Sequence, residues 1–151
     1  MKAKSGFTLV EILIVVVILG ILAAIVIPQF TDASTEAKES SLLSDLQTMR
    51  SQIELYKIQH NGALPGTQGF NFTQAMTRKT NALGTTNPAQ GRVKYGRYMR
   101  EIPANSWNDK NTVSEADTTP SAPDNSSGWF YNTSNGNIRS NDTVDPNHWY
   151  W

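Results

Sequence analysis

The sequence of 151 residues contains no cysteine, so it forms no disulfide and carries neither a thiolate nucleophile nor a cysteine-ligated zinc. Its two histidines, His60 and His148, stand in no catalytic or metal-binding motif, and we expect both at surface or capping positions. The formal net charge is zero, which leaves no electrostatic footprint for nucleic acid. These absences argue against an enzyme and against a nucleic-acid-binding protein. They do not exclude a site outside the cytoplasm, where disulfides are common but not required.

An uncharged and almost wholly apolar run extends over residues 12–27. Residues 7–30 would form roughly 36 Å of helix, which is long enough to span a bilayer. Glu11 stands immediately before the run, and a carboxylate at the edge of a membrane helix is costly unless something positive meets it. This requirement indicates assembly with a partner rather than chemistry on a small substrate.

The block KSGFTLVEILIVVVILGILAAIVIP, residues 4–28, resembles the N-terminal signature of type IV pilins and of type II secretion pseudopilins. The resemblance implies a leader, residues 1–6, which a prepilin peptidase removes by cutting between Gly6 and Phe7, and N-methylation of Phe7. It also implies that Glu11 of one subunit attracts the positively charged N-terminus of a neighbour in a filament. A carboxylate in low dielectric gains most from such a partner. The alternative is that Glu11 extends to the lipid headgroups.

The leader also predicts how the chain lies in the membrane. A secretory signal peptide is cut after its apolar region, whereas here the cut precedes it, so the apolar segment stays in the mature protein. Lys2 and Lys4 precede the run, and no basic residue follows until Lys38. This asymmetry predicts a single pass through the bacterial inner membrane, with a cytoplasmic N-terminus and a periplasmic C-terminal domain.

Gly20 and Pro28 are the two residues of this segment least suited to a helix interior. Glycine permits a close neighbour or local melting, and proline should kink or loosen the helix around Ala24. The resemblance implies that part of this helix melts when subunits pack in a filament. An ordinary kink is the alternative.

A second helical segment follows, with apolar residues at spacings of three and four between polar ones. It covers residues 31–61 and should end near His60-Asn61-Gly62, because asparagine and glycine stop helices. Its apolar stripe should face the core of a small globular domain, residues 62–151. The stripe consists of Phe30, Ala33, Ala37, Leu42, Leu46, Met49, Ile53 and Tyr56.

The globular part is predicted to hold a short helix at residues 73–82, a long loop at 105–127, and a strand at 128–132 that pairs back with residues 137–140 as a hairpin. The aromatic tail, residues 149–151, should pack on this domain, with an exposed contact surface as the alternative. The fold is therefore α+β: a long N-terminal helix packed against a small domain with a short antiparallel sheet and a long loop. The resemblance implies the pilin fold.

Many major pseudopilins bind calcium in a C-terminal loop, and calcium requires six to eight oxygen ligands. The sequence offers oxygens here, but neither the family's aspartate-rich spacing nor an EF-hand pattern is present. We therefore assign no metal ligand and expect no cofactor, with calcium in this loop as the alternative. The candidate oxygens belong to Asn108, Asp109, Glu115, Asp117, Asp124, Asp142 and Asp145.

Three functions are compatible with these observations. The first is a type II secretion pseudopilin, which would partner a prepilin peptidase, an inner-membrane assembly platform, other pseudopilins and copies of itself. The second is a type IV pilin serving adhesion, motility or DNA uptake; many such pilins carry a C-terminal disulfide, which this chain cannot form. The third is a single-pass membrane protein that binds a ligand through its aromatic tail.

Overall fold

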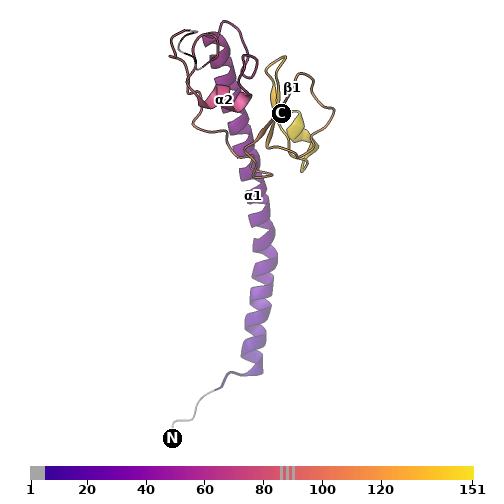
Figure 1. Ribbon diagram of the computed structural model, residues 1–151. Helices are drawn as coiled ribbons and strands as arrows, with labels where there is room; N and C mark the ends of the chain where they lie inside the picture. The colour runs from indigo at the N-terminus through magenta and orange to yellow at the C-terminus, as the bar shows by residue number, and fades with distance from the viewer. Residues whose placement is uncertain (1–5, 86, 88, 90) are drawn as a thin grey trace. The chain divides into compact units, whose positions relative to one another are not determined.

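The computed structural model describes residues 6–85, 87, 89 and 91–151. The chain divides into two compact units, Met1–Lys38 and Glu39–Trp151, and each is described by itself. Helix α1, Leu9–Gln59, contributes to both (Figure 1). This division falls inside the segment 31–61 that the sequence assigns to the amphipathic part of the helix.

The first unit is one helical segment with an uncovered apolar surface. Every described residue from Gly6 to Lys38 is exposed, and α1 is long and apolar enough to cross a membrane. Helical structure continues through Gly20 and Pro28 without a break. Phe30, Ala33 and Ala37 of the predicted stripe are exposed within this unit, so the prediction that they face the core of the domain is wrong. No described residue buries these side chains, so their burial requires lipid or other subunits.

In the second unit the stripe on α1 forms one side of the core. Leu42, Leu46, Met49, Ile53 and Tyr56 are buried, as predicted from their spacing. The other side of the core comes from α2, Phe72–Thr77, and from the sheet, which gather around this part of the helix (Figure 1). Their buried members are Phe72, Ala75, Met76, Trp129, Tyr131 and Ile138, and Ile102 joins them from the segment that precedes β1.

A Schellman-type cap ends α1 at the predicted place. Asn61 adopts a left-handed conformation, with φ of 54°, and the Gly62 N–H donates to the Lys57 carbonyl at 2.8 Å. His60, one residue earlier, stands at the capping position of α1 and is buried, so of the surface and capping positions expected for it the surface one is wrong. Its ring stacks on Tyr56 at 3.8 Å between centroids, and its Nε2 lies 2.9 Å from the Thr80 hydroxyl. Burial lowers the pKa of His60.

Helix α2 is shorter than predicted. Asn71 caps its start, with Oδ1 accepting the Gln74 N–H at 2.8 Å, but the helix ends at Thr77 rather than near residue 82. The chain becomes extended at Arg78, and the Thr80 N–H then donates to the Tyr95 carbonyl at 2.9 Å. Pairing with a distant segment therefore overrides the local helical preference.

The sheet has three strands in the order β1-β2-β3 and is mixed rather than purely antiparallel. β2, Trp129–Asn132, pairs antiparallel with β3, Ile138–Ser140, which confirms the predicted hairpin. β1, Val113–Ala116, pairs parallel with β2 and lies inside the segment predicted to be loop. Its four residues are all half-buried and show no alternation of apolar and polar positions, so only the backbone pairing with β2 identifies it as a strand.

The C-terminal tail packs on the domain, as expected. The short helix η2, Pro146–Trp149, leads into it, and the Trp149 ring lies 5.4 Å from that of Phe130. Arg139 donates to the Trp149 carbonyl at 3.3 Å, and Arg50 of α1 donates to the Trp151 carbonyl. Trp149 is buried, whereas Tyr150 is 72% exposed.

We predict that Leu46→Ala lowers the free energy of unfolding by about 2–5 kcal/mol, because it leaves a cavity in the core. Leu43→Ala, in the same helix but at a position that is 40% exposed, should cost less than about 1 kcal/mol. Chemical unfolding of the detergent-solubilised protein, followed by tryptophan fluorescence, measures both. Equal losses for the two variants would contradict this assignment of the core face.

Candidate assembly site and C-terminal polar network

The predicted processing site lies at the start of α1. Gly6 and Phe7 are exposed, Phe7 at 85%, while residues 1–5 of the predicted leader lie outside the described residues. A Cβ added at Gly6 would meet no atom within 4 Å. The described residues therefore leave the bond between Gly6 and Phe7 exposed, as an endopeptidase requires.

Glu11 closes a capping box with Thr8. The Glu11 carboxylate accepts the Thr8 backbone N–H and the Thr8 hydroxyl, each at 2.8 Å, and the Glu11 N–H lies 3.2 Å from the Thr8 hydroxyl oxygen. Thr8 is then the N-cap residue and Glu11 the third residue of the helix, an arrangement that satisfies two otherwise unpaired donors. The sequence carries this signal as Thr-x-x-Glu before an apolar run, and the membrane position of Glu11 alone does not reveal it.

The capping box fixes where the Glu11 charge lies. Removal of the leader after Gly6 would place a new amino group on Phe7, one residue before the cap. A carboxylate can accept more than two hydrogen bonds, so capping by Glu11 and an ion pair with an amine are compatible. Gly20 and Pro28 lie farther along α1 and contribute no polar group to this site.

The seven candidate calcium ligands do not converge on one point. Among the residues described, no group of three or more histidine or acidic side chains could hold a metal ion. Glu115 accepts the Phe72 N–H at 2.9 Å, and Asp145 accepts the Asn147 N–H at 2.8 Å, so both cap helices. Asp109 and Asp117 are exposed. The remaining three, Asn108, Asp124 and Asp142, belong to networks of hydrogen bonds within the chain.

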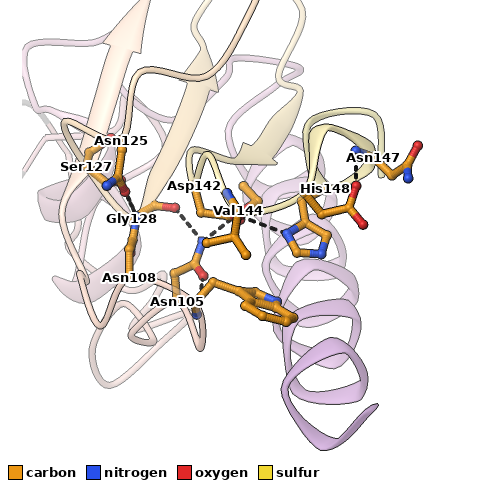
Figure 2. A network of polar contacts seen from close by, with 12 residues as sticks. Asn105, Asn108, Asn125, Ser127, Gly128, Asp142, Val144, Asn147 and His148 are labelled. Atoms are coloured by element: carbon orange, nitrogen blue, oxygen red, sulfur yellow. Dashed lines mark hydrogen bonds and ion pairs between the residues drawn. The ribbon is translucent and has the colours of Figure 1, made fainter. Parts of the chain in front are cut away.

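Asp142 and His148 form a buried pair that sequence reasoning missed (Figure 2). The Asp142 carboxylate lies 2.9 Å from His148 Nδ1 and also accepts the Val144 N–H at 3.1 Å and the Ser140 hydroxyl. The His148 ring packs between two tryptophans, 5.0 Å from Trp107 and 4.7 Å from Trp151. The surface position expected for His148 is therefore wrong, because a carboxylate six residues earlier in the chain compensates for its burial.

The pair stabilises the tail rather than forming a catalytic site. Burial raises the pKa of Asp142, but the hydrogen bonds from Ser140, His148 and Val144 outweigh burial and hold that pKa below its usual value. The Ser140 hydroxyl bonds to the carboxylate and not to the imidazole, so the three side chains do not form the serine–histidine–aspartate relay of a hydrolase.

Comparison with known proteins identifies the family. Residues 1–27 match the family model described as the prokaryotic N-terminal methylation motif. The type II secretion system core protein G of Pseudomonas aeruginosa is 36% identical over 106 residues, which cover 70% of each chain. The chain belongs to the type II secretion core protein G family.

Other members of this family show similar agreement. The core protein G of Vibrio cholerae is 33% identical over 119 residues, covering 78% of this chain and 75% of the relative. That of Aeromonas hydrophila is 30% identical over 106 residues. No solved structure matches the chain significantly. Membership confirms the predicted resemblance to pseudopilins, and the uncovered apolar helix agrees with the single inner-membrane anchor of this family.

We predict that Asp142→Asn lowers the free energy of unfolding by about 2–3 kcal/mol near pH 6, because it removes the charge that accepts three hydrogen bonds. The folded pKa is lowered, so the contribution of Asp142 is complete above its unfolded pKa of about 3.9. It is lost as the pH falls through the folded pKa. The difference between wild type and variant should therefore shrink below about pH 4.

Unfolding experiments across this pH range measure that difference. Asp117→Asn, at an exposed position, is the matched control and should change stability little at any pH. A wild-type advantage over Asp142→Asn that stays constant down to pH values near 2 would count against the assigned direction of the pKa shift.

Proposed function

We propose that this chain is a core structural subunit of a type II secretion pseudopilus, anchored in the inner membrane before assembly and polymerised by burying the same helix in a filament. The observation that carries the proposal is an exposed apolar helical surface, which follows Glu11 and begins within a few residues of the Gly6–Phe7 bond. Membership in the core protein G family supports the secretion machine as its setting.

Two opposite charges at the start of α1 drive the assembly step: the amine that cleavage creates on Phe7, and the carboxylate of Glu11. Prepilin peptidase cuts after Gly6 on the cytoplasmic side and leaves a positive amine on Phe7, which N-methylation does not neutralise. The capping box keeps the Glu11 carboxylate in a fixed position one helical turn away. When a neighbouring subunit arrives, its amine pairs with this carboxylate, and the pair offsets the cost of bringing either charge into a dry filament core.

The two other functions have less support. A type IV pilin is not favoured, because the relatives found are type II secretion core proteins. A ligand-binding role for the aromatic tail conflicts with the burial of Trp149 and with its contact to Phe130. The relatives are structural proteins, which agrees with a chain that is not an enzyme.

We predict that mass spectrometry of the mature protein finds an N-terminus at Phe7 carrying one methyl group. Gly6→Leu should leave the chain uncut, because a large side chain hinders the extended backbone that a peptidase needs. Ser5→Ala is the control and should be processed normally. Because no atom lies within 4 Å of a Cβ at Gly6, loss of cleavage would not result from misfolding. A mature chain that retains Met1 would refute the processing site.

The Glu11 charge and its capping role can be separated by two substitutions. Glu11→Gln keeps an oxygen that can accept the Thr8 N–H, so the capping box survives, but it removes the charge. Glu11→Ala removes both. If the ion pair drives assembly, neither variant forms filaments or restores export of folded proteins to a strain that lacks this gene, and both stay in the membrane.

Wild-type protein in the same strain is the positive control, with filaments counted by electron microscopy and export measured as enzyme in the medium. Normal filaments from Glu11→Gln but none from Glu11→Ala would show that capping, not charge, is what assembly needs. Loss of surface fibres with normal export in the deletion strain would favour the pilus function instead.

A further inference from the structure

The long loop, residues 105–127, is held by N–H donors from three asparagine side chains, of which Figure 2 shows Asn105 and Asn108. Asn105 Nδ2 donates to the Gly128 carbonyl at 2.9 Å and to the Ser140 hydroxyl at 2.7 Å. Asn108 Nδ2 donates to the Ser127 carbonyl at 3.0 Å and to Asn125 Oδ1 at 2.7 Å. Each amide therefore joins two segments that are far apart in the sequence.

A third asparagine, Asn141, follows β3 directly and donates hydrogen bonds to the same loop. Its Nδ2 donates to Asp124 Oδ1 at 2.8 Å and to the Ser127 hydroxyl at 2.9 Å. Asp124 Oδ1 also accepts the backbone N–H of Ser126 at 2.9 Å and its hydroxyl at 2.7 Å. These bonds, first those from Ser126 and then that from Asn141, lower the pKa of Asp124 to about 2. The carboxylate charge is thus already met by donors of the protein.

The orientation of the three amides is fixed by their oxygen ends. Asn105 Oδ1 accepts the Trp107 N–H at 2.9 Å, and Asn108 Oδ1 accepts the Lys110 N–H at 3.1 Å. Asn141 Oδ1 accepts the Asp124 N–H at 3.1 Å. A flipped amide would place its NH₂ group against a backbone N–H, so the observed orientation is the one that satisfies both ends. The amides consequently present donors, not oxygen ligands, to the loop.

A positive side chain completes the closure. Lys110 Nζ donates to the Asn125 carbonyl at 2.5 Å, and this oxygen belongs to the same segment that Asn108 holds. Calcium binds oxygens and is excluded by ammonium and amide N–H groups directed at those oxygens. The calcium that the family resemblance implies for this loop therefore does not fit the residues present.

We infer that the Lys110 ammonium and the amides of Asn105, Asn108 and Asn141 close this loop in place of calcium, so that the subunit folds without the ion. The role of a divalent cation is to draw together oxygens from separate segments. Here six N–H···O contacts from three amides, together with the Lys110 contact, join the same kind of groups across the loop.

The first test is thermal unfolding of the full-length mature protein in detergent, in EGTA and in about 5 mM calcium, a concentration above the usual Kd of extracellular calcium modules. The two melting temperatures should agree within about 1 °C. A rise of about 5 °C or more in calcium would overturn the inference, since an ion that binds the folded state raises the melting temperature.

The second test replaces the hydrogen-bond donors of one amide by a carboxylate, which is a calcium ligand. Asn141→Asp is nearly isosteric, but it replaces N–H donors by a carboxylate facing Asp124. Closure by amides predicts a fall in melting temperature of at least about 4 °C, in calcium as well as in EGTA. A calcium site predicts the opposite sign, because an added carboxylate would strengthen binding and raise the melting temperature in calcium.

Lys110→Met is a milder change, because it removes one hydrogen bond and should leave a folded protein whose melting temperature can be measured. It should lower the melting temperature by an equal amount in calcium and in EGTA, because the lost contact involves no ion. Lys79→Met, at an exposed position, is the matched control and should leave the melting temperature unchanged. An unchanged melting temperature in Lys110→Met would show that the Lys110 ammonium group does not help to hold the loop.

Discussion

The structure depends on an apolar surface that the subunit cannot bury by itself. Over the first unit, α1 exposes aliphatic side chains throughout, and such a surface is stable only in lipid or against copies of itself. The same helix can serve both environments because its backbone hydrogen bonds are satisfied internally. Its polar start is the exception, and the Thr8–Glu11 capping box satisfies it. The carboxylate of Glu11 therefore completes the helix, and in the function that we propose it also supplies a charge for a neighbouring subunit.

The remaining part of α1 solves a different problem. The domain of residues 39–151 is small and polar, and a small domain buries a limited fraction of its apolar surface. Leu42, Leu46, Met49, Ile53 and Tyr56 provide a rigid apolar stripe on which α2 and the sheet can pack. Arg50, from the same segment, also holds the Trp151 carbonyl. One helix supplies both the apolar N-terminal segment and five of the twelve residues of the core cluster. The core therefore forms without a second long helix.

Periodicity and capping signals predicted the elements that depend on local sequence. The stripe on α1 from Leu42 to Tyr56, the end of this helix at Gln59 and the β2–β3 hairpin follow from residue spacing and from Asn-Gly turns, and the structure confirms them. The features missed depend on distant partners. β1 is a strand only because it pairs with β2, α2 ends early because Thr80 pairs with Tyr95, and His148 is buried only because Asp142 compensates it. Of the proposed assembly site, the sequence motif predicts Gly6, Phe7 and Glu11, and the structure adds the cap at Thr8, whose signal is the Thr-x-x-Glu pattern before an apolar run.

The abundance of asparagine and serine in the C-terminal half, which resembles an ordinary solvated loop in sequence, acquires a physical role in the structure. A chain without cysteine cannot close long loops covalently. A side-chain amide is an effective substitute, because its two N–H groups can donate to segments distant in the sequence while its oxygen accepts a backbone N–H. Such networks stabilise a domain only when every member is satisfied, since a half-paired buried amide costs more than an apolar residue would. Asn105, Asn108 and Asn141 each meet that condition at both ends, so they can hold the loop without a metal ion.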